Sequence, residues 1–267
     1  MFAAEPPQTN YDLHFHAAGV PVRVHPWFWL MSLLLGVGSF NKPNPPQEII
    51  LWVGVVFVSI LVHELGHVAA FRYFGQRAKV VLYSFGGLAM PDERDVYRGY
   101  DDYSSSYHRE ERGAGAEMMI AFAGPLAGFL FAVLVFAIIA ASGHEPSIRL
   151  GGPTAFEIRF APFRWENLDL LFRQLLFVNV FWGLINLLPV FPLDGGQISR
   201  HFLTKFNPGE GLRQSILVSI FVAIGVAVWA LIKIDDKFMA FLFGYLAYVN
   251  YQVLQQISGG YGGGREW

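Results

Sequence analysis

The chain has no cysteine among its 267 residues, and this absence limits how it can bind a metal. Without thiols there is no disulfide framework and no thiolate zinc site, so a metal has to be held by histidine and carboxylate side chains. Charge is also scarce, because 15% of the residues are charged and 54% are hydrophobic. A typical soluble domain has about 25% charged residues. The composition excludes an ordinary soluble domain and predicts an all-α polytopic membrane protein.

Two further absences narrow the function. The formal net charge is −2 and the basic residues are scattered, so no nucleic-acid partner is expected. Residues 1–14 lack a basic start followed by an apolar core, so we expect no cleavable signal peptide. The first membrane span would then act as the insertion signal.

Long apolar runs are present instead, and most approach the roughly 20 residues that cross the hydrocarbon of a bilayer. We expect about six transmembrane helices, at residues 26–40, 49–71, 118–141, 170–188, 215–232 and 238–257. If the spans alternate, 12 Lys and Arg residues fall on one side and 6 on the other. The positive-inside rule makes the richer side cytoplasmic. The chain is therefore expected in a plasma (inner) membrane with both termini in the cytoplasm.

The second run contains His63-Glu64-Leu65-Gly66-His67 toward its cytoplasmic end. Residues four apart share one face of a helix, so His63 and His67 can present two imidazoles to one metal ion while Glu64 reaches water there. A charged residue at the bilayer centre costs on the order of 2.5 to 3.5 kcal/mol, which makes Glu64 a functional candidate. The alternative is a pair of interfacial histidines beside a snorkelling glutamate.

The fourth run ends in a helix break that carries a carboxylate. Its sequence is Asn186-Leu187-Leu188-Pro189-Val190-Phe191-Pro192-Leu193-Asp194-Gly195-Gly196. Two prolines three apart cannot lie inside a regular helix, so we expect extended chain and then a tight turn at the glycines. Irregular backbone at membrane depth is tolerated only beside protein or a water-filled cavity. Both motifs lie near the cytoplasmic side, so Asp194 is a candidate third metal ligand.

These two motifs, in this order and spacing, resemble the site-2 protease family of intramembrane zinc metalloproteases. Weaker similarities lie at residues 19–26, 85–87 and 123–128, so that the resemblance covers roughly residues 19–196. The resemblance implies a three-helix catalytic core with a small membrane-associated β-hairpin or sheet after the zinc helix. It also implies one Zn2+ per chain, bound by His63, His67 and Asp194, with Glu64 activating water.

The resemblance gives roles to further residues. Asn186 matches a position that helps to stabilise the oxyanion. Gly86 and Gly87 resemble a sheet edge that would pair with an unwound substrate, with a simple hairpin turn as the alternative. Asn179 lies seven residues before Asn186, so it shares that helix face and could support the site. Alternatively, its amide bonds a neighbouring helix.

The expected organisation has four parts. They are a cytoplasmic N-terminal segment (1–25), a catalytic membrane core (26–200), two additional C-terminal transmembrane helices (201–257) and a C-terminal tail (258–267). The core holds the zinc motif (63–67), a charged cytoplasmic loop (72–116) and the Asp-Gly motif (186–196). Part of that loop, 92–112, is dense in charged residues and is expected to be solvated, with a gating role as the alternative.

The resulting functional hypothesis is hydrolysis of peptide bonds within or next to a transmembrane segment, with the active site toward the cytoplasm. The substrate in the lipid bilayer would be a single-span membrane protein or a remnant signal peptide. No CBS domain is recognisable, so CBS-mediated nucleotide binding is not expected. A catalytically inactive zinc-binding adaptor and a metal or proton transporter are the alternatives. Glu64 argues against the adaptor, and the lack of an internal repeat argues against the transporter.

Overall fold

The computed structural model describes residues 5–36, 45–84, 86–91, 113–150 and 156–260. The chain divides into two compact units. The first consists of Met1–Glu111, Ala123–Ile148 and Ile158–Leu184, and the second of Arg112–Phe122, Arg149–Glu157 and Ile185–Trp267.

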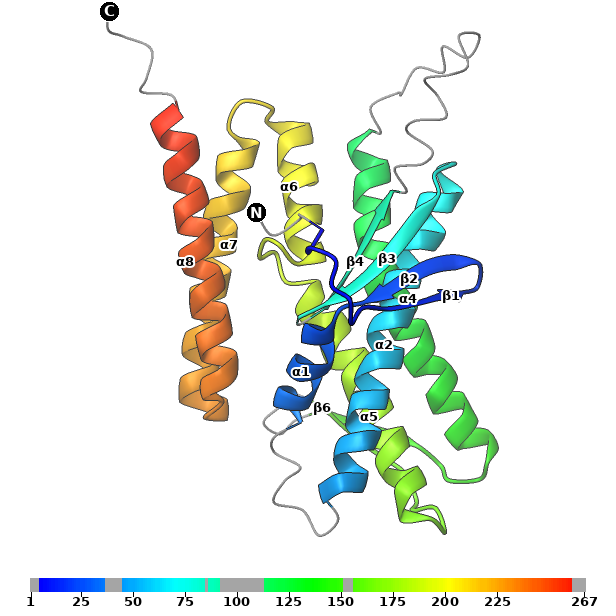
Figure 1. Cartoon of the computed structure of the whole chain (residues 1–267). Coiled ribbons are helices and arrows are strands. Elements are labelled where there is room, and N and C mark those ends of the chain that lie inside the picture. Colours follow the sequence, from blue (N-terminus) through cyan, green and yellow to red (C-terminus); the bar gives the residue numbers. More distant parts are fainter. Residues whose placement is uncertain (1–4, 37–44, 85, 92–112, 151–155, 261–267) are drawn as a thin grey trace, which may run out of the picture. The chain divides into compact units, whose positions relative to one another are not determined.

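A four-stranded sheet lies in the first unit, in the order β1 (Leu13–Ala17), β2 (Val20–Val24), β3 (Ala78–Tyr83) and β4 (Gly86–Pro91) (Figure 1). The β1–β2 and β3–β4 pairs are antiparallel, while β2 and β3 are parallel. The two central strands are the buried ones, because apolar residues dominate both. The small sheet expected after the zinc helix is confirmed. It also contains two strands from the N-terminal segment, for which the sequence predicted no element.

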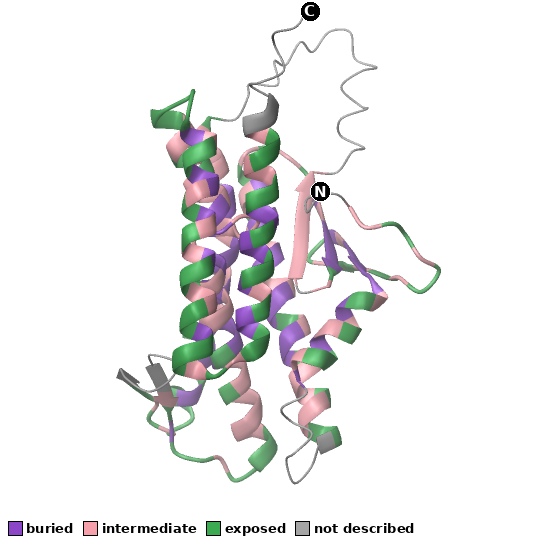
Figure 2. Cartoon of the chain, turned by 90° about the vertical axis from the view of Figure 1, so that its left-hand side faces the viewer, coloured by how far each residue is buried: buried purple, intermediate pink, exposed green. Residues whose placement is uncertain are grey.

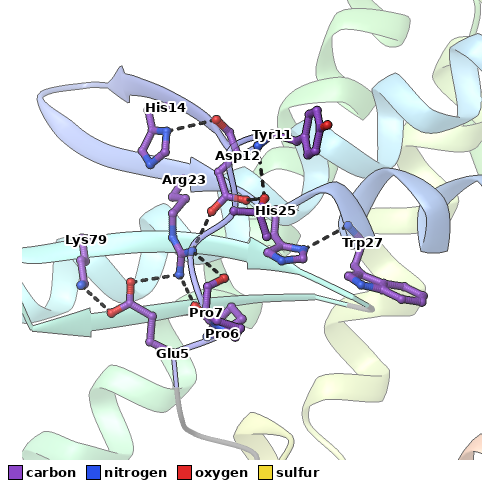
Figure 3. Close-up of polar contacts among 11 residues, drawn as sticks. Glu5, Pro6, Pro7, Tyr11, Asp12, His14, Arg23, His25, Trp27 and Lys79 are labelled. Atoms are coloured by element: carbon purple, nitrogen blue, oxygen red, sulfur yellow. Dashed lines mark hydrogen bonds and ion pairs between the residues drawn. The ribbon is translucent and has the colours of Figure 1, made fainter.

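Arg23 of β2 anchors the N-terminal segment to this sheet (Figure 3). Its guanidinium donates hydrogen bonds to Glu5 Oε1 at 3.0 Å and to Asp12 Oδ2 at 2.8 Å. Lys79 of β3 donates to Glu5 Oε2 at 2.6 Å. Burial disfavours the charged form of Asp12, but hydrogen bonds from Thr9 and Arg23 outweigh burial and lower the pKa of the carboxyl below its usual value.

Four of the described helices are long and apolar enough to cross a membrane. They are α2 (Pro45–Tyr73), α4 (Ala114–Ala141), α5 (Glu166–Asn186) and α7 (Gly211–Trp229), which continues through the π-helical segment η2 (Ala230–Ile234). Large apolar side chains on them are exposed, such as Val133 at 64% and Phe221 at 71%. Figure 2 shows exposed residues in green along the long helices. Contact with lipid instead of water explains these exposed apolar helix faces. The chain is therefore an integral membrane protein.

Two of the six predicted spans are not among these four helices. Helix α1 (Pro26–Leu35) has 10 residues and therefore spans about 15 Å, half the thickness of the hydrocarbon. The rest of that predicted span, 37–40, lies outside the described residues. Helix α8 (Lys237–Gly260) has 24 residues, but tyrosine, asparagine and glutamine side chains lower its hydropathy. The count of six stays a prediction.

The second unit contains α6 (Asp194–Phe206), α7, η2 and α8. Helices α7 and α8 lie side by side and contact each other along their lengths (Figure 1). Between α4 and α5 the chain forms a two-stranded sheet, β5 (Ser147–Leu150) and β6 (Phe156–Arg159), which the sequence did not predict. The charged segment 92–112 of the predicted loop lies outside the described residues, as do residues 261–267 of the tail.

Candidate metal centre

Helix α2 brings two histidines together inside the first unit. His63 and His67 lie one turn apart, and their side chains are 4% and 7% exposed. The two Nε2 atoms are 3.2 Å apart, and the rings meet edge to face. Two nitrogens bound tetrahedrally to one zinc ion, each at 2.0–2.1 Å, lie about 3.3 Å apart. The pair therefore has the geometry of two ligands to one metal ion.

A glycine keeps space open beside these nitrogens. Gly124 lies on α4, and a methyl group added to it would stand 2.8 Å from His63 Nε2 and still closer to His67 Nε2. Those separations approach the length of a metal–nitrogen bond and are too short for a non-bonded carbon. The missing side chain thus leaves room where a metal would bind, and the residues fit a zinc ion. The sequence singled out Gly124 only as part of the weaker family similarity at residues 123–128.

Glu64 lies beside the histidines and contacts the sheet. It is 4% exposed, and Gly87 of β4 faces its carboxylate so closely that a Cβ on Gly87 would stand 2.7 Å from Glu64 Oε1. Only glycine leaves space for the carboxylate at this point. The structure therefore places β4 directly against Glu64. Gly86 itself contacts Trp182 at an ordinary distance.

Asn179 is buried on α5 and bonds to α2. Its Nδ2 donates to Ser59 Oγ at 2.9 Å and to Leu175 O at 2.8 Å. Ser59 is one helical turn before His63 and shares its face of α2. The alternative reading of Asn179, an amide that bonds a neighbouring helix, describes this contact. Ser59 was not singled out in the sequence, although its four-residue spacing from His63 was available as a signal.

The second unit holds the carboxylate motif. Helix α5 ends at Asn186, which is 7% exposed, and α6 begins at Asp194. The intervening residues form consecutive turns, with Val190 N donating to Leu188 O at 2.7 Å and Leu193 N to Val190 O at 2.8 Å. The expectation of an extended chain was therefore wrong.

The expectation that the two glycines make a tight turn was also wrong. Gly195 and Gly196 lie in the first turn of α6 and are buried. A Cβ on either would collide with the backbone, at Leu187 and Leu188 for Gly195 and at Val190 and Phe191 for Gly196. The glycines let α6 start directly against the preceding turns. Their role is close backbone approach.

Imidazole nitrogens and a carboxylate are the zinc ligands available to a chain without cysteine. His63 and His67 in the first unit and Asp194 in the second are donors of these types. This agrees with the ligand types that the absence of cysteine predicted.

A sequence model of peptidase family M50 matches residues 51–228, which is more than half of the chain. The chain belongs to peptidase family M50. It is 27% identical over 199 residues to a zinc metalloprotease of Methanocaldococcus jannaschii, an alignment that covers 73% of this chain and 47% of that protein. It is 25% identical over 240 residues to stage IV sporulation protein FB of Bacillus subtilis, covering 88% and 66%.

The solved structure of a site-2 protease from Methanocaldococcus jannaschii is similar to this M50 chain. The TM-score is 0.50 at 23% identity, and the similarity covers 91% of this chain and 95% of that one. At this identity it shows a shared fold. The family resemblance inferred from the two motifs is confirmed. The sequence alignments span about half to two thirds of the length of these M50 relatives.

Proposed function

We propose that this M50 chain is an intramembrane zinc metalloprotease that hydrolyses peptide bonds within or next to the transmembrane segments of membrane proteins. The observation that carries the proposal is the pair of converging nitrogens of His63 and His67, with Glu64 buried beside them on a helix able to span a membrane. One Zn2+ per chain would be held by these two histidines and Asp194. Buried Glu64 disfavours an inactive zinc-binding adaptor, which would need no general base.

In the proposed reaction, zinc, Glu64 and Asn186 have separate roles. Bound zinc supplies a Lewis acid, which makes water an effective nucleophile near neutral pH. Glu64 takes a proton from the attacking water and delivers it to the amine nitrogen as the peptide C–N bond breaks. The side-chain amide of Asn186 donates a hydrogen bond to the carbonyl oxygen as negative charge develops on it. Asn179 supports the site by joining α5 to α2 through Ser59.

Strand β4 is the proposed substrate edge. It is the last strand of the sheet, half-buried along its whole length, and within the described residues only β3 pairs with it (Figure 2). An extended peptide can add to such an edge through main-chain hydrogen bonds. Gly86 and Gly87 would guide it past Glu64. A helical substrate first has to unwind, because its carbonyls are engaged in its own hydrogen bonds.

The substrate class follows from the setting in the bilayer. A single-span membrane protein or a remnant signal peptide presents one transmembrane segment that can unwind and pair with β4. The proposed topology has six spans, with α1 and α8 as parts of the first and last. The excess of basic residues on one side supports cytoplasmic termini and an active site toward the cytoplasm of the plasma (inner) membrane.

Substrate trapping tests the proposed function. Glu64→Gln keeps the size and hydrogen-bonding reach of the side chain but cannot accept the proton, so the variant should retain a substrate that the wild-type chain cleaves. Membranes expressing each form are crosslinked, and captured proteins are identified by mass spectrometry. Each captured protein is then reconstituted with wild-type chain and assayed for cleavage. Glu48→Gln, the same change in the first turn of α2, is the matched control and should trap nothing.

Capture of single-span proteins that wild-type chain then cuts within their span supports the proposal. If Glu64→Gln and Glu48→Gln capture the same proteins, or if the captured proteins are not cleaved, the proposed function is wrong.

A further inference from the structure

The backbone of Phe191 lies in the turns between α5 and α6, three residues before Asp194. A peptide group outside regular structure needs partners for its N–H and its C=O when it is away from water. Both groups of Phe191 find them in the side chains of the two C-terminal helices. The N–H donates a hydrogen bond to a side chain of α7, and the C=O accepts one from a side chain of α8.

Ser219 supplies the contact from α7. Phe191 N donates to Ser219 Oγ at 3.1 Å, and the serine hydroxyl in turn donates to Ser215 O at 2.9 Å in its own helix. Ser219 is 1% exposed. The second hydrogen bond fixes the hydroxyl proton on the helix, so a lone pair of Oγ faces the N–H of Phe191.

Asn250 supplies the contact from α8. It is 0% exposed, and its Nδ2 donates to Phe191 O at 2.7 Å and to Leu246 O at 2.8 Å. Within the described residues its Oδ1 has no hydrogen-bond partner. A buried oxygen without a partner is unfavourable, so an apolar side chain would serve better if α8 only had to pack. The hydrogen bond that the Asn250 Nδ2 donates to Phe191 O explains why an amide is present here.

The position of Phe191 determines the position of Asp194 through contacts at the start of α6. Gly196 lies so close to the backbone of Val190 and Phe191 that a Cβ on it would collide with both residues. Gly195 contacts the turn at Leu187 and Leu188 in the same way. Since α6 begins at Asp194, its first turn rests on the segment that α7 and α8 hold. A shift of Phe191 would therefore shift Asp194.

We propose that Ser219 and Asn250 form a backbone clamp, which fixes Phe191 and thereby sets the position of the Asp194 carboxylate. The two C-terminal helices then belong to the machinery that positions the metal ligand, although they contribute no ligand themselves. The clamp rests on the proposed function, because it gives Asp194 the role of a zinc ligand. Ser219 and Asn250 are positioning residues.

Metal affinity in the purified full-length protein tests the clamp. Ser219→Ala and Asn250→Leu each remove one hydrogen bond to Phe191, while Asn250→Leu keeps the branching and the number of side-chain heavy atoms. Ser215→Ala is the matched control, because its hydroxyl donates only to Leu212 O, in the same helix. Ser219→Thr keeps the hydroxyl and should restore binding. Zinc affinity is measured by chelator competition, and Co2+ absorption spectra report the ligand geometry.

We expect Ser219→Ala and Asn250→Leu to bind zinc about tenfold more weakly than wild type, in the range found for groups that support metal ligands. Their Co2+ spectra should change, while Ser215→Ala and Ser219→Thr should match wild type. If Asn250→Leu does not give monodisperse protein, Ser219→Ala against Ser215→Ala decides, because both lose one hydroxyl from the same helix.

Wild-type affinity and spectra in both clamp variants would overturn the clamp, as would an equal loss in Ser219→Ala and Ser215→Ala. His67→Ala, measured in parallel, separates this result from failure of the zinc site. If His67→Ala loses zinc and the clamp variants do not, only the clamp is wrong. If His67→Ala keeps its zinc, the proposed site is wrong and the clamp falls with it.

Discussion

The two regions that we propose bind zinc are built in different ways. On α2 a regular helix positions His63, Glu64 and His67 through its own hydrogen bonds, and glycines on other elements leave space around them. Before Asp194 the chain leaves regular helix, and side chains of α7 and α8 bond the backbone of Phe191 in that segment. The first region can be inferred from spacing along the chain, whereas the second depends on residues distant in sequence.

This difference follows from the hydrogen bonds that the backbone of each region needs inside a membrane. A helix satisfies its own backbone, so the histidines require only local geometry and room for the metal. A broken helix leaves polar groups that other helices have to satisfy. The carboxylate region therefore needs hydrogen bonds from other helices, which the histidine region does not need. We expect the two regions to respond differently to mutation.

Removing a ligand from either region should have the largest effect. His67→Ala and Asp194→Ala each delete a donor, and we expect both to lose zinc by more than the roughly 10- to 100-fold that supporting groups cost. Inductively coupled plasma mass spectrometry of purified protein measures the metal content. His16→Ala, an exposed histidine on β1, is the control and should retain one zinc per chain. Full zinc content in Asp194→Ala would remove the second region from the site.

Filling the space beside the histidines should come next. In Gly124→Ala the added methyl group would stand where the metal binds, so zinc content should fall although every ligand is present. Gly128→Ala makes the same change one turn along α4, where a Cβ would meet Asn179 O at an ordinary 3.5 Å. That variant should keep its zinc. Equal zinc content in the two variants would show that the metal does not occupy the space beside Gly124.

Moving the general base should have a smaller effect that leaves the metal in place. Gly87→Ala pushes a methyl group against the Glu64 carboxylate, so we expect cleavage to slow by about tenfold, which is less than the 10²- to 10⁴-fold lost when a positioned base is removed. Zinc content should stay at the wild-type level. Gly54→Ala on α2, where a Cβ would meet nothing within 4 Å, is the control for the rate measurement. Wild-type cleavage by Gly87→Ala would contradict the proposed contact between β4 and the base.

The smallest effect should lie outside both regions, at Asp12. The pKa of Asp12 is lowered in the folded protein, so its contribution to stability is present above the unfolded pKa of about 4 and is lost as the pH falls through the folded pKa. Asp12→Asn should lower the melting temperature by about 2–4 °C at pH 7, and this difference should shrink below pH 4. Thermal unfolding in detergent at pH 7 and pH 3.5 measures it. A difference that grows on acidification would contradict the assigned ion pair with Arg23.

The sequence predicted the parts of this molecule that depend on local periodicity. Apolar runs marked the helices that can cross the membrane, and the four-residue spacing marked His63 and His67. It did not predict β1 and β2. Strand β2 pairs with β3, which lies beyond a whole membrane helix in the sequence, and β1 joins the sheet only through its hairpin with β2. Arg23 and Lys79, which share Glu5, could not be paired from the sequence for the same reason.

Contacts between residues that are not adjacent in the sequence also explain the wrong predictions at the helix break before Asp194. The prolines correctly indicated that α5 ends before Pro189. The glycines were read as turn residues because glycine often serves in turns, but here the decisive factor is backbone contact with residues 187–191. Ser219 and Asn250 look like ordinary polar residues in membrane helices until their shared partner, Phe191, is known.

The most direct test of the central claim separates metal binding from proton transfer. Zinc content and cleavage of a captured substrate are measured side by side for wild type, Glu64→Gln and His63→Ala in reconstituted membranes. Glu64→Gln should hold one zinc per chain and cleave about 10² to 10⁴ times more slowly than wild type, whereas His63→Ala should lose both zinc and cleavage. Near-normal cleavage by Glu64→Gln would contradict the proposed mechanism, even if zinc were bound at the two histidines.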